Sequence, residues 1–214
     1  MKEIYLKEFE VYKKSYQKSF WWTFIISIII LIVCFTLSFS MADFFIKQTE
    51  DIAESIANNM AKMSGKEINE LSDIQTFLLI FWNNLKVVTI TILLGIIPFY
   101  RLSSFFTIFQ FSVVGVVFGG LFAMGHNVIN AFTFSFLPHA IFELTALVYS
   151  VAIGNFINKN ILAKVFFRKK KDSEPIGNLL KPSLRSYLFV VIPLLLIASF
   201  IEAFITSRLS ENFL

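Results

Sequence analysis

An uncharged segment, Phe20–Met41, constrains this chain more than any other feature. Its 22 residues contain no Asp, Glu, Lys or Arg. At 1.5 Å rise per residue, a helix of this length crosses the ~30 Å hydrocarbon core of a bilayer. The run is longer than the apolar region of about 7 to 15 residues in a secretory signal peptide. It therefore predicts an uncleaved membrane anchor.

Four more apolar runs follow, at residues 77–98, 103–124, 132–157 and 187–206. The whole chain is 56% hydrophobic and only 16% charged, which is too apolar for a typical soluble domain. The runs are long and do not alternate in polarity, so helices are expected rather than strands. We predict an all-α, polytopic transmembrane helix bundle of about five spans, with residues 1–214 forming a single membrane domain.

Two polar segments flank the first span. Residues 1–19 place Tyr5, Phe9, Tyr12 and Tyr16 at helical spacing among five lysines, which predicts an interfacial helix, with a plain charged tail as the alternative. Between residues 43 and 73, seven acidic residues stand against three lysines. Apolar residues at helical spacing within this acidic segment predict a short amphipathic helix that ends before Gly65.

The lysine and arginine distribution predicts the orientation. Basic residues collect before the first span, at Arg101, and between residues 158 and 185, whereas the segment between residues 43 and 73 is acidic. By the positive-inside rule the N-terminus is cytoplasmic, and we expect a bacterial cytoplasmic membrane. The chain has a net charge of +4, and its basic residues collect beside the spans. We therefore expect these basic residues to face the lipid bilayer and not nucleic acid.

Polar residues inside the spans are the candidate functional residues. Each ionisable group in a span costs about 2.5 to 3.5 kcal/mol on insertion scales, so it needs a partner or a cavity. With the orientation above, the candidates all fall in the outer half of the bilayer, which predicts one shared polar cluster formed by Asn83, Asn84, Lys86, His139, Glu143 and Glu202.

Three roles for this cluster remain open. The side chains could only tie helices together, they could relay a proton or a ligand, or they could bind a metal. His139 and Glu143 share a helix face, and Glu202 would complete three ligands, the number typical of catalytic zinc. Lys86 could instead neutralise a glutamate or extend to the head groups. No other cofactor is expected, because the chain has no nucleotide-binding motif and a single cysteine, Cys34.

Gly115 and Gly119 are four residues apart in the third run. This small-residue face predicts close helix packing rather than chemistry. Together with the odd number of spans, it is compatible with a homodimer.

Three short motifs resemble the stage II sporulation protein M family: Asn83-Asn84-Leu85-Lys86-Val87, Pro138-His139-Ala140-Ile141-Phe142-Glu143-Leu144 and Ile201-Glu202-Ala203-Phe204-Ile205-Thr206. The resemblance covers roughly residues 74 to 206. The family usually has glycine at the position of Ala140, and an asparagine-glycine pair where this chain has Gln110, Phe111 and Ser112. By resemblance His139, Glu143 and Glu202 are motif positions, but the match implies no role for them.

The resemblance implies a membrane protein that works with partners. One branch of the family holds cell-wall hydrolases during sporulation, and another occurs with circular bacteriocins, in maturation, secretion or immunity. We therefore expect a non-enzymatic scaffold that binds other membrane or envelope proteins or a peptide. An intramembrane enzyme, either a metal-dependent peptidase or a peptide cyclase, and a small transporter are the alternatives.

Overall fold

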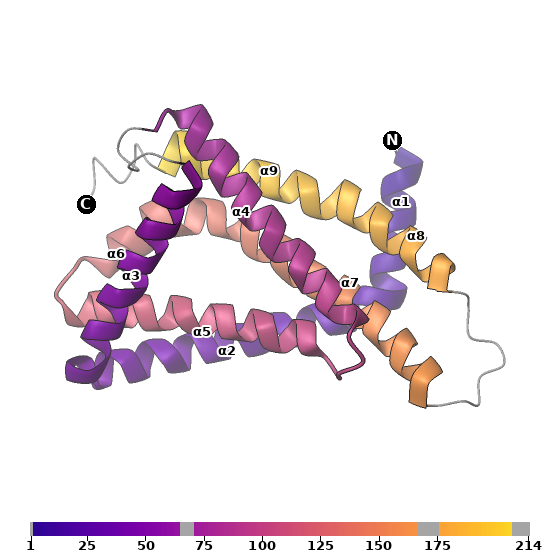
Figure 1. Cartoon of the computed structure of the whole chain (residues 1–214), viewed down its shortest axis with the longest axis horizontal. Helices are drawn as coiled ribbons and strands as arrows, with labels where there is room; N and C mark the ends of the chain where they lie inside the picture. The colour runs from indigo at the N-terminus through magenta and orange to yellow at the C-terminus, as the bar shows by residue number, and fades with distance from the viewer. Residues whose placement is uncertain (1, 65–70, 167–175, 207–214) are drawn as a thin grey trace.

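The computed structural model describes residues 2–64, 71–166 and 176–206, and these residues form helices and short turns without any strand (Figure 1). Five of the described helical segments are long and apolar enough to cross a membrane. The predicted all-α, five-span architecture is therefore confirmed. Part of the acidic segment and part of the basic segment, residues 65–70 and 167–175, lie outside the described residues, as does Arg208.

The elements are, in chain order, α1 (Lys2–Val11), η1 (Tyr12–Tyr16), α2 (Gln17–Ser40), α3 (Ala42–Ser64), α4 (Asp73–Leu93), η3 (Leu94–Ile96), α5 (Leu102–Ala123), α6 (Val128–Asn130), η4 (Ala131–Phe136), α7 (Leu137–Phe166), α8 (Ile176–Ser186), η5 (Tyr187–Val191), α9 (Ile192–Ile201) and η6 (Glu202–Thr206). The segments η1, η4, η5 and η6 are π-helical turns, and η3 is a 3₁₀ turn.

The N-terminal segment is helical as expected, and it bends away from the axis of α2 at the η1 turn (Figure 1). Its four aromatic residues divide into two groups. Tyr12 and Tyr16 pack against the ring of Tyr149, with ring centroids 5.9 and 5.6 Å apart, while Tyr5 and Phe9 remain exposed. The aromatic residues of η1 are thus packed against the bundle, whereas those of α1 are exposed.

Several helices extend beyond the segments that predict them. The amphipathic helix α3 has 23 residues and follows α2 almost directly, so it is not short. Helix α4 starts at Asp73, where Ser72 and Gln75 form a reciprocal capping box, and α7 continues to Phe166. Hydropathy alone misses such ends because polar residues propagate a helix as well as apolar ones do.

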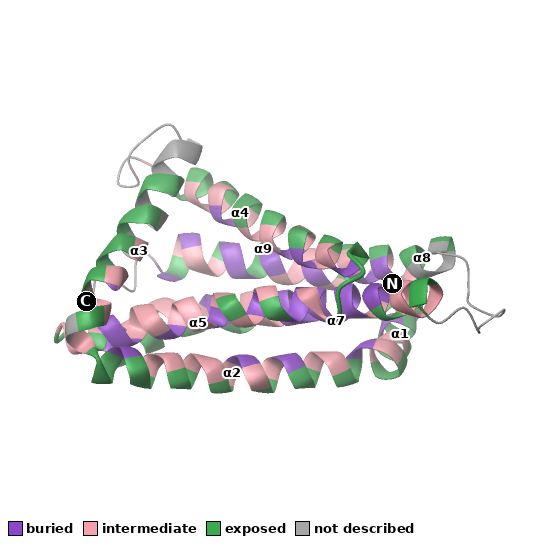
Figure 2. Ribbon diagram, turned by 60° about the horizontal axis from the view of Figure 1, so that its bottom comes forward, coloured by how far each residue is buried: buried purple, intermediate pink, exposed green. Residues whose placement is uncertain are grey.

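Helix α7 lies in the middle of the bundle. All ten residues from Ala146 to Asn155 are buried, a pattern that α2, α4, α5 and α9 do not show over any comparable length (Figure 2). Helix α7 contacts all four of these helices, whereas α2 packs chiefly on α5, and α4 packs on α9. The core is therefore built around one helix that is buried on every side along this stretch.

Backbones approach closely at several glycines. Gly115 and Gly119 of α5 face α2, where an added Cβ atom would meet the carbonyl oxygens of Leu31 and Phe35. At the other end of the bundle, an added Cβ at Gly95 would overlap the backbone of Gly154. These contacts bring helix axes close enough for extensive van der Waals packing, which replaces the hydrophobic effect between helices in lipid.

Asn158 holds the tight connection between α4 and α5 against α7. Its Nδ2 donates to the carbonyl oxygens of Ile97 and Phe99, at 2.7 and 3.1 Å, and its Oδ1 accepts from the Arg101 backbone N–H at 3.3 Å. The side chain is 2% exposed. One buried amide thus satisfies backbone groups that have no helical partner of their own.

We expect Gly95→Ala to destabilise the protein by about 1 to 3 kcal/mol, because the new methyl group has no room beside the Gly154 backbone. Thermal unfolding in mild detergent measures the change. Gly177→Ala is the matched control, since nothing lies within 4 Å of a Cβ at Gly177. Equal melting temperatures for the two variants would contradict the close contact.

Candidate functional site

Three of the predicted residues meet in space. His139 and Glu143 lie one turn apart on α7, and Glu202 begins η6 at the end of α9. One potential ligand atom from each residue lies within 4.8 Å of the others. We call these three residues the intramembrane cluster.

Irregular helix turns position two members of the cluster. The π-helical turn η4 ends just before Pro138, whose ring has no N–H to donate to the preceding turn. The second π-helical turn, η6, begins at Glu202 and contacts both η4 and α7. Such turns insert an extra residue into a helix and are frequent at functional sites, because they redirect side chains.

The His139 side chain is enclosed. The residue is 8% exposed, and its ring meets the ring of Phe136 edge to face, with centroids 5.7 Å apart. Its Nδ1 atom is buried and makes no hydrogen bond of normal geometry within the described ranges, although the Ser135 backbone lies close enough to interact with the ring. The ring nitrogen that does not face Ser135 is the one that can take a proton or a metal ion.

The asparagines and the lysine of α4 do not all join the cluster. Asn84 lies within hydrogen-bonding reach of the Glu143 carboxyl. Asn83 and Lys86 are exposed, and the Lys86 ammonium lies 6.0 Å from the centroid of the Trp82 ring. Among the described residues, Lys86 makes no ion pair with either glutamate.

The cluster combines two carboxyl groups and one imidazole in a poorly hydrated environment. Two ionised carboxylates at this separation repel each other strongly, and a shared proton or a divalent cation removes the repulsion. Ligands about 2.1 Å from a tetrahedral zinc ion are about 3.4 Å apart. Because the three ligand atoms lie within 4.8 Å of one another, any pair needs to approach by at most about 1.4 Å to bind zinc, which a rotamer adjustment can supply.

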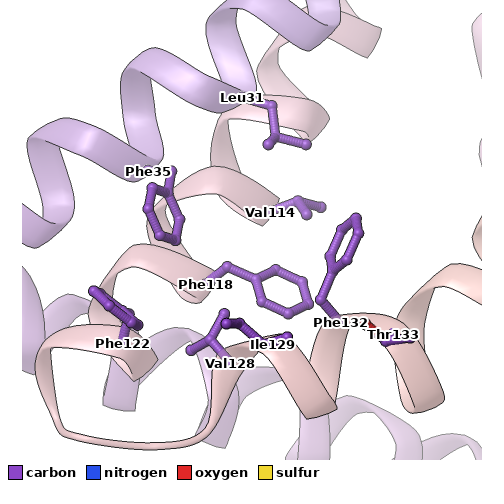
Figure 3. A pocket seen from close by; sticks show the side chains of 9 residues that line it. All are labelled: Leu31, Phe35, Val114, Phe118, Phe122, Val128, Ile129, Phe132 and Thr133. Carbon is purple, nitrogen blue, oxygen red and sulfur yellow. The ribbon is translucent and has the colours of Figure 1, made fainter.

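An apolar cavity of about 440 Å³ lies beside the intramembrane cluster. Its lining comes from α2, α5, α6 and η4, and Figure 3 shows the side chains of Leu31, Phe35, Val114, Phe118, Phe122, Val128, Ile129, Phe132 and Thr133. The Phe118 ring contacts Phe136, with centroids 5.2 Å apart, and Phe136 contacts His139. Aromatic contacts thus connect the cavity wall to the cluster.

Sequence reasoning missed several buried polar residues outside the cluster. Glu8 pairs with Arg185, and its second oxygen accepts from the Ser186 hydroxyl at 2.6 Å. Asn155 and Asn158 are also buried. The two asparagines stand three apart in an apolar run, which was a usable signal, whereas nothing local to Glu8 points to a partner 177 positions away.

We expect the cluster residues to be energetically coupled. Glu143→Gln and Glu202→Gln should each lower the melting temperature, and the double variant should depart from additivity by about 0.5 to 3 kcal/mol, because the two carboxyls share one environment. Asn83→Ala, which alters an exposed neighbour, should combine additively with Glu202→Gln. Wild-type behaviour of Glu143→Gln would contradict the assignment of this residue to the cluster.

Comparison with known proteins places the chain in a family. A family model described as stage II sporulation protein M matches residues 20–207, a range that contains the whole intramembrane cluster. An uncharacterized protein of Methanocaldococcus jannaschii is 35% identical over 162 residues, which cover 73% of this chain and 86% of that protein. No solved structure matches. The chain belongs to the stage II sporulation protein M family of membrane proteins.

Proposed function

We propose that this chain is a non-enzymatic membrane protein that binds a partner segment within the bilayer. The finer roles that fit are maturation, export or immunity of a circular bacteriocin peptide, or assembly of envelope-remodelling proteins. Family membership supports the general class. The apolar cavity beside the intramembrane cluster is the observation that carries the proposal.

The cavity has the chemistry of a docking site for an apolar segment. Eight of its nine lining residues are apolar and four of them are phenylalanines. Ile129, at its edge, is 74% exposed. An apolar helix or peptide that inserts side chains here would gain van der Waals contacts, which drive association between helices in lipid.

The proposal includes the orientation expected from the lysines, with the N-terminus cytoplasmic in a bacterial cytoplasmic membrane. The arrangement of the helices supports it. The segment that carries the N-terminal lysines (α1, η1 and the start of α2), the turn between α4 and α5 and the C-terminal end of α7 lie at one end of the bundle, and the acidic α3 lies at the other (Figure 1). The cavity then opens in the outer half of the bilayer.

Photocrosslinking in native membranes tests the partner. We expect p-benzoyl-phenylalanine in place of Ile129 to form a discrete adduct with one protein or peptide that reaches the outer half of the bilayer. Phe109 is the matched control, because it lies on α5, is 65% exposed and does not line the cavity. The same lipid adducts at both positions, or an adduct with a purely cytoplasmic protein, would contradict the proposal.

A second candidate function is a metal-dependent intramembrane enzyme, such as a peptidase or a peptide cyclase. The geometry of the cluster favours it, since three ligand atoms within 4.8 Å leave a fourth position for water or substrate. In this case zinc would supply the activated water, and His139, Glu143 and Glu202 would hold the ion.

Metal content tests the second candidate. Purified protein loaded with zinc and then desalted should retain about one ion per chain, and His139→Ala should lose it, because three protein ligands are the usual number for catalytic zinc. His126→Ala is the control, since this histidine is exposed and outside the cluster. Elemental analysis gives the stoichiometry. Equal zinc in both variants, or none in the native chain, would exclude this candidate.

A further inference from the structure

A small polar pocket lies at the end of the bundle opposite to the intramembrane cluster. Its volume is about 120 Å³, well below the 300 to 1,000 Å³ typical of drug-sized ligand sites. The start of α2, the turn between α4 and α5, and the C-terminal half of α7 contribute its lining residues: Ser15, Lys18, Ser19, Tyr100, Arg101, Asn155, Phe156, Asn158 and Lys159. We call it the basic pocket.

The charge of the basic pocket is entirely positive. Lys18, Arg101 and Lys159 contribute three cations, and none of the nine lining residues is acidic. Among the described residues, no ion pair joins Lys18, Arg101 or Lys159 to a carboxylate. Three cations from separate elements that converge without a counter-ion favour an anionic ligand.

Aromatic residues hold the arginine in place. The Arg101 guanidinium carbon lies 4.2 Å from the centroid of the Trp22 ring and 5.5 Å from that of Tyr100. Arg101 also adopts a left-handed backbone conformation, with φ at 57°, which is costly for a residue with a side chain and marks functional positions more often than others. The hydrogen bond from its N–H to Asn158 fixes this conformation.

The floor of the basic pocket is polar and built from buried groups. Asn155 is 8% exposed and donates from Nδ2 to the hydroxyl oxygens of Ser19 and Ser104, both at 2.7 Å. Ser19 accepts this bond, so its own hydroxyl can donate to a ligand. The Oδ1 atom of Asn155 is buried and has no partner within the described ranges.

The basic pocket lies at the membrane interface. Trp21, Trp22 and Tyr100 are exposed around it, and Trp and Tyr concentrate where the hydrocarbon core meets the head groups. A ligand in the pocket would therefore have its polar part among the three cations and any apolar chain beside the exposed Phe99 and Tyr100. This combination matches a phospholipid.

We propose that the basic pocket binds the phosphate group of an anionic phospholipid. Lys18, Arg101 and Lys159 neutralise the phosphate, and Ser19 donates a hydrogen bond to it. Because α2, the α4–α5 turn and α7 all contribute, one bound lipid would join three separate spans at this end of the bundle.

Native mass spectrometry of the whole chain in detergent tests this proposal with phosphatidylglycerol as the probe. We expect one tightly retained phosphatidylglycerol per chain and much weaker retention of zwitterionic phosphatidylcholine. Lys18→Gln combined with Lys159→Gln should weaken binding about thirty-fold, because each basic residue near an anionic lipid contributes a factor of about five. Both lysines are exposed, so the fold should be retained.

Two further variants control for charge. Lys14→Gln combined with Lys181→Gln removes the same charge from exposed lysines outside the pocket and should bind as the native chain does. Lys18→Arg combined with Lys159→Arg should retain binding, since the cations remain. Equal weakening by both glutamine pairs, or no lipid retained by the native chain, would overturn the proposal.

Competition with inorganic phosphate distinguishes a phospholipid from free phosphate as the source of the bound phosphate group. Millimolar phosphate should not displace phosphatidylglycerol if the acyl chains add contacts at the interface. Complete displacement that depends on Lys18 and Lys159 would identify a site for free phosphate and would overturn the assignment to a lipid.

Discussion

The burial of α7 among four other helices is the arrangement on which the rest of the structure depends. Ala146, Ser150 and Gly154 are each four residues apart and buried, so they form a stripe of small side chains along this helix. In a bilayer, lipid tails are as apolar as helix surfaces, so the hydrophobic effect does not drive helices together. Close packing of small residues drives their association. Near Gly154 the backbones come so close that even a methyl group at Gly95 would overlap.

The same helix carries polar groups at both of its ends. His139 and Glu143 lie near its start, while Asn155 and Asn158 lie about 24 Å further along the axis, a distance that spans most of the hydrocarbon core. Between these ends the helix is buried and almost entirely apolar. The polar groups of the bundle core thus lie at two depths. Carboxyl groups and an imidazole lie at one depth, and cations and amides lie at the other.

Much of the architecture could be predicted from the sequence, because the bilayer imposes one length and one composition on every span. The uncharged run at 20–41 forms α2 with only small shifts at its ends. His139 and Glu143 lie on one face of α7, as their spacing of four residues requires. The length of α3 could not be predicted, because polar residues continue a helix without a hydropathy signal. The burial of Glu8 could not be predicted either, because its partner Arg185 is distant in sequence.

The sequence by itself determined that this chain spans a membrane with five helices, that its charges are unequally distributed, and that His139, Glu143 and Glu202 lie in apolar surroundings. Only the tertiary structure decided which polar residues meet. It brings Glu202 to His139 and Glu143, leaves Lys86 outside, and gathers Lys18, Arg101 and Lys159 around one pocket. The physical reason is that helical spacing sets neighbours within one helix, whereas neighbours between helices depend on how small residues and irregular turns let those helices pack.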